Sequence, residues 1–164
     1  MGFDTGTALT VDGVTYSFPL GGATMVVGDS TDISATYTGA CTYSSFTDYT
    51  PDDCGTGNSL GVGGTGTTAT IGYAFDSGFS LAGGVSSTPT DILGDSADLF
   101  GVEAAYSADT YGVAVAYVTD DGGASADTTY WGVNGYYTFD LASLSVGFET
   151  SDDGTTEKSG YFVG

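Results

Sequence analysis

The stretch TTYWGVNGYYTFDLASLSVGFET, residues Thr128 to Thr150, decides the fold. It predicts two strands of about ten residues joined by a tight turn at Asp140, because large apolar residues alternate with small or polar ones. The apolar parity holds Trp131, Val133, Gly135, Tyr137 and Phe139 on the first strand and Leu144, Val146 and Phe148 on the second. A membrane-crossing β-strand has about 9 to 11 residues with this alternation and with aromatic residues near the two membrane surfaces. A hairpin of a soluble β-sandwich alternates in the same way, so this stretch leaves both architectures open.

Composition narrows the class of protein. The 164 residues suit one domain. One Lys or Arg stands against 21 Asp and Glu, a formal net charge of -20, which would repel nucleic acid and excludes it as a partner. Aromatic residues make up 13% of the chain and mean hydropathy is +0.08, which favours an ordered protein over a disordered one. Segments rich in Val, Thr, Tyr and Phe, with 28 glycines and no sustained helical periodicity, predict an all-β fold.

The two cysteines point to an oxidising compartment. Cys41 and Cys54 lie in a segment of Ser, Thr, Tyr and Asp, and the chain has no His to complete a zinc site. We expect a disulfide that closes this small loop; the alternative is two unpaired thiols. The chain has no run of about 18 apolar residues and so no expected transmembrane helix, which leaves a β-barrel as the route into a membrane. Its first 13 residues include acids and no basic residue, unlike a signal peptide.

The whole chain predicts an antiparallel up-and-down meander of about ten strands. A long loop is expected over residues 38–64. The expected strands are Thr7 to Val11, Val14 to Phe18, Gly22 to Val27, Ile33 to Tyr37, Thr67 to Phe75, Phe79 to Val85, Phe100 to Tyr106, Tyr111 to Val118, the two strands of the opening hairpin, and Thr156 to Val163. The parity of the last strand stays open, because Tyr161 and Val163 oppose Lys158 and Phe162.

The connections and the two strand parities favour a transmembrane β-barrel, or part of one, as a single domain over residues 1–164. Short turns alternate with long polar connections, as in outer-membrane barrels. The parity opposite the large side chains is mostly Gly, Ala, Ser and Thr, and it holds Glu103 and Glu149, so we expect it to face the interior. Small residues there would equally suit close packing of two sheets. The residues expected to form a membrane-interface girdle are Phe75, Phe79, Tyr106, Tyr111, Trp131, Tyr137 and Phe139.

Three stretches resemble the barrel portion of cyanobacterial outer-membrane porins of the marine unicellular type. They are ALTVDGVTYSFPLGGATMVVGD (Ala8 to Asp29), DDCGTGNS (Asp52 to Ser59) and TATIGYAFDSGFSLAGGVSS (Thr68 to Ser87). Porins of this family are larger and carry an N-terminal S-layer-homology segment, so the resemblance implies a fragment or a short relative. It also implies a homotrimer in the bacterial outer membrane, in contact with outer-membrane lipid, that lets small hydrophilic solutes diffuse passively.

The candidate site residues are acids of the interior and of the loops. Under the porin hypothesis they concentrate cations and repel anions, so we expect cation preference. The candidates are Asp48, Asp52, Asp53, Glu103, Asp120, Asp121 and Glu149. The Asp-rich turns at Asp52, Asp120 and Asp152 are expected to be solvated, with a calcium site as the alternative; no other cofactor is expected.

Two rival functions remain. An enzyme is not expected, because without His only paired carboxylates could act, and 21 acids make such pairs inevitable. The first rival to the porin is a secreted acidic β-sandwich that acts as a structural or surface-layer unit, with stabilisation by calcium as an option. The second is a soluble binding module.

Overall fold

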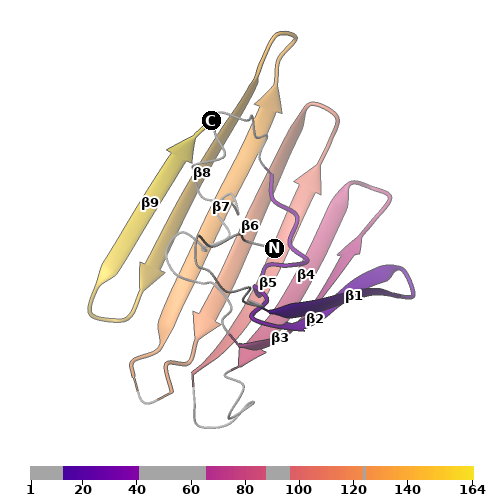
Figure 1. The fold of residues 1–164 in the computed structure, drawn as a ribbon. Helices are drawn as coiled ribbons and strands as arrows, with labels where there is room; N and C mark the ends of the chain where they lie inside the picture. The colour runs from indigo at the N-terminus through magenta and orange to yellow at the C-terminus, as the bar shows by residue number, and fades with distance from the viewer. Residues whose placement is uncertain (1–12, 41–65, 88–96, 124) are drawn as a thin grey trace, which may run out of the picture.

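The computed structural model describes residues 13–40, 66–87, 97–123 and 125–164. They form nine antiparallel strands in a single sheet whose spatial order follows the chain order (Figure 1). The strands are β1 Val14–Leu20, β2 Ala23–Asp29, β3 Thr67–Ala74, β4 Phe79–Ser87, β5 Asp98–Ser107, β6 Tyr111–Asp120, β7 Thr128–Thr138, β8 Ser143–Asp152 and β9 Glu157–Val163. The predicted all-β up-and-down meander is confirmed.

One expected strand is wrong. Residues Ile33 to Tyr37 form turns instead, with the N–H of Ala35 donating to the carbonyl of Asp32 at 3.1 Å and that of Tyr37 to Ser34 at 2.8 Å. Ser30, with a positive φ of 53°, takes the chain out of β2 and onto one face of the sheet. The expected strand over Thr7 to Val11 and the Cys41–Cys54 disulfide lie outside the described residues.

The strand register separates two faces. On the outer face large apolar residues pair across neighbouring strands, for example Val115 with Val133 and Tyr117 with Trp131. Exposed large apolar side chains occur on every strand except β2, whose outward Met25 and Val27 are half-buried. The predicted parity of the central strands is therefore confirmed.

The opposite parity forms the inner face. Small side chains such as Ala105, Ala114 and Ala116 are buried there, with 4% or less of each exposed. The last strand follows the same pattern: Tyr161 and Val163 pair with Phe148 and Val146 on the outer face. Phe162 turns inward and lies over Gly147.

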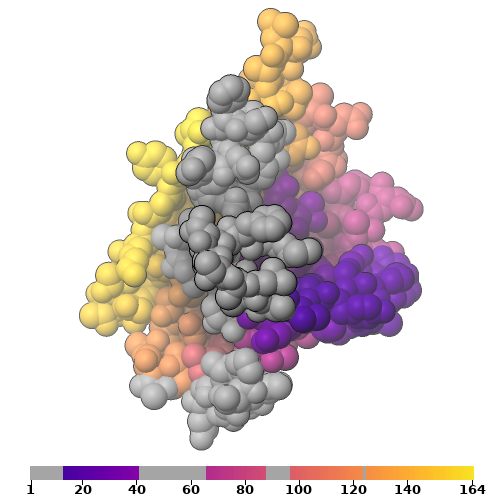
Figure 2. Space-filling view, in the orientation of Figure 1, coloured from indigo at the N-terminus to yellow at the C-terminus, as the bar shows by residue number. Residues whose placement is uncertain are grey.

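The sheet is open. β1 and β9 are its two edges and do not pair with each other among the described residues. Because every neighbouring pair is antiparallel, β1 and β9 run in the same direction. Short turns join β1–β2, β3–β4, β5–β6 and β7–β8 at one end, and the β7–β8 turn projects beyond its neighbours, with Leu141 fully exposed (Figure 2). We call this end the short-turn end.

The inner face as candidate functional site

Residues 30–40, which we call the inner segment, cross the inner face of the sheet (Figure 1). Hydroxyl groups attach its first half. The Thr31 side chain bonds that of Thr15 at 2.6 Å, and its carbonyl accepts from the Thr68 hydroxyl at 2.5 Å. Further along, the hydroxyls of Thr36 and Thr70 bond to each other. The threonines of the inner parity therefore serve as partners for a segment that has left the sheet.

Two strand side chains hold the second half of the inner segment. The N–H of Thr38 donates to Glu103 Oε2 at 2.6 Å, and the N–H of Ala40 donates to Asn134 Oδ1 at 2.6 Å. Glu103 comes from β5 and Asn134 from β7, and each is 3% exposed. Both are acceptors for backbone donors that would otherwise lack a partner, which explains why polar side chains are retained on a buried face.

A small apolar cluster lies beneath the middle of the inner segment. Ile33 is completely buried and packs with Val118, flanked by Leu99 and Tyr130. Ile33 fits here because the strand residue beneath it is a glycine: a Cβ on Gly84 would lie only 3.2 Å from Ile33 Cγ1. Glycine on the inner face therefore sets how closely the inner segment approaches the sheet.

Tyr37 covers the same face with its hydroxyl group over Gly101. Within the part of the chain that the structure describes, that buried hydroxyl has no hydrogen-bond partner, and neither does the buried Glu103 Oε1. Burial, and then the nearby charge of Glu103, raises the pKa of the Tyr37 hydroxyl above its usual value. Tyr37 is therefore a neutral group placed beside a carboxyl group that has one satisfied oxygen and one unsatisfied oxygen.

The two inner glutamates share one cross-strand row. Glu103 pairs with Ala116, Ala116 with Gly132, and Gly132 with Glu149. Two small residues thus separate two carboxyl groups, both 3% exposed, on one face of a curved sheet. The prediction that both glutamates avoid the outer face is confirmed by this register. The row concentrates negative charge in the interior whenever both carboxyl groups are ionised.

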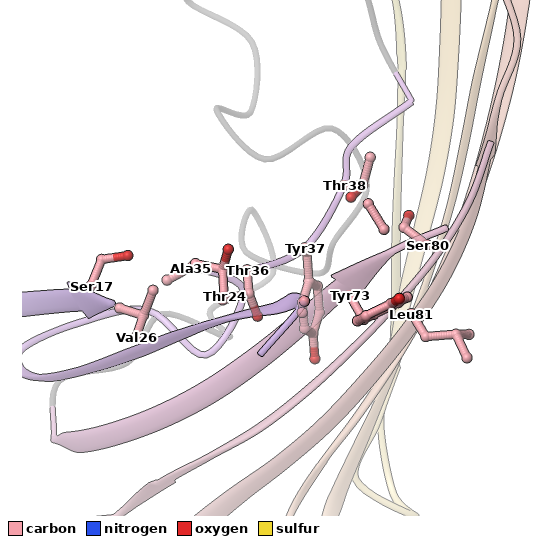
Figure 3. A pocket seen from close by; sticks show the side chains of 13 residues that line it. Ser17, Thr24, Val26, Ala35, Thr36, Tyr37, Thr38, Tyr73, Ser80 and Leu81 are labelled. Atoms are coloured by element: carbon pink, nitrogen blue, oxygen red, sulfur yellow. The ribbon is translucent and has the colours of Figure 1, made fainter. Parts of the chain in front are cut away.

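A cavity of about 360 Å³ lies between the inner segment, the β1–β2 hairpin and strands β3 and β4 (Figure 3). Its walls carry hydroxyl groups and the Tyr37 ring, and none of the lining residues that the structure describes is charged. The hydroxyl-bearing residues of the lining are Ser17, Thr24, Thr36, Tyr37, Thr38, Tyr73 and Ser80. The space suits water or small neutral polar molecules, and it leaves the inner segment unsupported on one side.

The other predicted acids have different placements. Asp120 and Asp121 fix the turn after β6: Asp120 Oδ1 accepts from Gly122 N at 2.9 Å, and Asp121 Oδ1 accepts from Asp98 N at 2.7 Å. They follow Ala116, the β6 residue of the glutamate row, by four and five residues, at the end of that strand. Asp48, Asp52 and Asp53 lie outside the described residues. In the described part of the chain no three acidic, His or Cys side chains are grouped to hold a metal ion.

The predicted girdle residues lie at two ends of the outer face. Aromatic pairs gather at the short-turn end, with ring centroids 4.8 Å apart for Phe79 and Tyr106 and 4.7 Å apart for Tyr137 and Phe139. Phe75 and Tyr111 belong to this end as well. Trp131 lies at the opposite end, stacked at 4.5 Å on Tyr117, which the predicted girdle omitted. Tyr117 follows Tyr111 by six positions on β6, which at about 3.3 Å per residue spans roughly 20 Å.

Sequence reasoning missed Tyr37 and the threonines that hold the inner segment. The periodic pattern identified which parity faces inward, but it gave no sign that residues 30–40 would lie against that parity. The available signal was the hydroxyl residues on the inner faces of β1 and β3, namely Thr15, Ser17, Thr68 and Thr70.

Comparison of the chain with models of known protein families, with curated proteins and with solved structures gave no match. Within the described residues, no helix has the length and apolar character needed to cross a membrane.

Proposed function

We propose that this chain is an outer-membrane porin, or the barrel portion of one, that provides a passive diffusion path for small hydrophilic solutes and prefers cations. The observation that carries the proposal is the outer face: apolar side chains cover one whole side of a single sheet, and the described residues supply no second sheet to cover them. Val102 is 57% exposed and Val133 42%. Contiguous apolar surface of this extent needs a lipid or protein environment.

The distribution of aromatic residues supports lipid as that environment. Aromatic pairs lie at both ends of the outer face, with Val113 and Val115 between them on β6. The span of roughly 20 Å between the two aromatic levels is comparable with the band about 25 Å tall of a transmembrane barrel. A strand tilted in the bilayer with Trp and Tyr at the two interfaces would produce this arrangement.

The inner face supports a hydrophilic interior. It carries hydroxyl groups, the two glutamates and Asn134, while the inner segment occupies part of the space. With one basic residue in the chain, Lys158 on β9, the interior and the rims are strongly acidic. An acidic, confined path raises the local concentration of cations and lowers that of anions.

Planar-bilayer recordings test the proposal. Purified protein should insert as discrete conductance steps, and a KCl gradient should give a reversal potential of the sign expected for K⁺ preference. Protein denatured before addition provides the control. Absence of channels, or a reversal potential of the opposite sign, would contradict the channel or its cation preference, respectively.

A simpler measurement separates the porin from the acidic β-sandwich. The porin should need detergent or lipid to stay dispersed and should migrate differently on gels before and after boiling. A sandwich should stay dispersed in buffer alone, and its unfolding temperature should respond to calcium chelation. The single sheet of the described residues favours the first outcome.

A further inference from the structure

We propose that the inner segment is a strap whose seating on the sheet is controlled by protonation of Glu103. With the Glu103 carboxyl group neutral the strap is seated as described above; with it ionised the strap lifts and water reaches the carboxylate. This movement takes place within the fold and does not depend on whether the protein conducts ions.

The geometry around Glu103 is the first support. Its side chain is 3% exposed, and the strap covers it through Thr38, whose N–H bonds Oε2. Oε1 has no hydrogen-bond partner among the described residues and no contact with solvent. An ionised carboxylate has several acceptor sites and is costly to bury unless they are filled or a countercharge lies close. Here one donor fills one site, so the seated strap suits the neutral carboxyl group better than the ionised one.

The surrounding charges give no compensation. On the strands next to β5, Glu103 pairs with Ala82 of β4 and Ala116 of β6, neither of which titrates. The strap contributes Tyr37, whose buried hydroxyl also lacks a partner, and the exposed acid Asp32.

The more distant charges do not help either. Glu149 lies further along the same row and adds negative charge. The single basic residue of the chain, Lys158, is exposed on β9 and pairs with Ser151. Lys158 is four strands away from Glu103, and the strands paired with β5 place no basic side chain beside this carboxyl group.

The strap can lift without breaking the sheet. Its polar attachments include the hydroxyl bonds at Thr31 and Thr36 and two backbone N–H bonds, all of which water can replace. The buried side chains of Ile33 and Ala40 also hold it by apolar packing, so lifting must be driven by the cost of burying an ionised Glu103. The cavity beside Ala35 to Thr38 gives it room to move. Lifting would hydrate both Glu103 Oε1 and the Tyr37 hydroxyl, the two unpartnered groups under it.

Hydrogen exchange of the full chain, kept dispersed in the same detergent throughout, tests the strap directly. The readout is the protection factor of the Thr38 amide, corrected for the intrinsic pH dependence of exchange. We expect protection to fall roughly tenfold or more between about pH 5 and about pH 8.5, while amides of β6 keep theirs. Equal Thr38 protection at both pH values would overturn the proposal.

Three variants identify the group responsible. Glu103→Gln keeps an acceptor for Thr38 N and cannot ionise, so its Thr38 protection should be independent of pH. Glu157→Gln removes one carboxylate from the exposed start of β9 and should behave as the unmodified chain. A pH dependence that persists in Glu103→Gln would assign the effect to another group and sink the idea. Should that variant not fold, Asn134→Asp decides: it should make protection of the Ala40 amide depend on pH, and an unchanged Ala40 protection would count against the mechanism.

Discussion

The hydroxyl group of Tyr37 lies so close over Gly101 that a Cβ on this glycine would overlap it. The same Cβ would come within 3.1 Å of Ile33 Cδ1 and of Val118 Cγ2. Gly101 thus sets the contact distance between the strap and the centre of β5.

Gly101→Ala should therefore destabilise the protein by about 1 to 3 kcal/mol, the usual cost of overpacking a filled site. Denaturant unfolding monitored by circular dichroism measures the change. Gly83→Ala is the matched control, because its Cβ on the outer face would meet only Gly101 O at 3.3 Å and Val102 Cγ1 at 3.7 Å. Equal losses for the two variants would show that Tyr37 does not pack on Gly101 as described.

A positive charge on the outer face separates a lipid environment from water. Val115 lies midway along β6, and Thr119 lies on the same face near the strand end. In lipid vesicles Val115→Arg should cost about 2 to 4 kcal/mol and Thr119→Arg about 0 to 1, because the cost depends on depth in the bilayer. Equilibrium unfolding in vesicles gives both values. A surface that faces water would tolerate both substitutions within about 0.5 kcal/mol, and that result would contradict the porin proposal.

The strands and their faces could be predicted from the sequence because their information is local. Large apolar residues alternate with small or polar ones in Tyr111 to Val118 and in the hairpin after Thr128. This alternation identifies each strand and the face on which each side chain lies. The last strand shows the limit: Tyr161 and Phe162 are adjacent aromatics, and only the register with Phe148 and Gly147 assigns them to opposite faces.

The strap could not be predicted in the same way. Ile33 and Tyr37 alternate with small residues much as a strand would, which produced the incorrect strand. Its backbone donors find their acceptors on Glu103 and Asn134, at 65 and 94 residues' separation in the chain. No local pattern encodes such partners. The sequence therefore predicts that Glu103 faces the interior, but not that it accepts a hydrogen bond from the strap.

Trp131 is the only tryptophan of the chain, so tryptophan fluorescence reports the depth of this one side chain in a bilayer. At one end of the outer face, stacked on Tyr117, it should lie at the membrane interface. We expect its fluorescence in vesicles to be quenched more by bromines attached near the lipid headgroup than by bromines near the chain ends. The control combines Trp131→Phe with Val115→Trp, which moves the reporter to mid-strand and should reverse the order. Quenching independent of bromine position in both proteins would contradict the lipid-facing assignment.

Asp153 makes the stability of the turn between β8 and β9 depend on pH in the acidic range. Its Oδ1 accepts the N–H of Thr155 at 2.8 Å and that of Thr156 at 2.6 Å. These two bonds, with a smaller contribution from Lys158, lower the pKa of Asp153 below its ordinary value of 3.8. The carboxylate therefore stabilises the turn above the unfolded-state pKa, and this contribution is lost as the pH falls through the lower folded-state pKa.

A carboxyl-carbon NMR titration should place the midpoint of Asp153 below 3.8, and the Thr155 amide should exchange faster once the carboxyl group is protonated. Asp153→Asn should remove the acid-dependent step in Thr155 exchange. Asp140→Asn removes a carboxylate from the exposed β7–β8 turn and should leave that step in place. A midpoint for Asp153 at or above 3.8, or a step that survives in Asp153→Asn, would mean that the carboxylate does not hold the turn through these N–H groups.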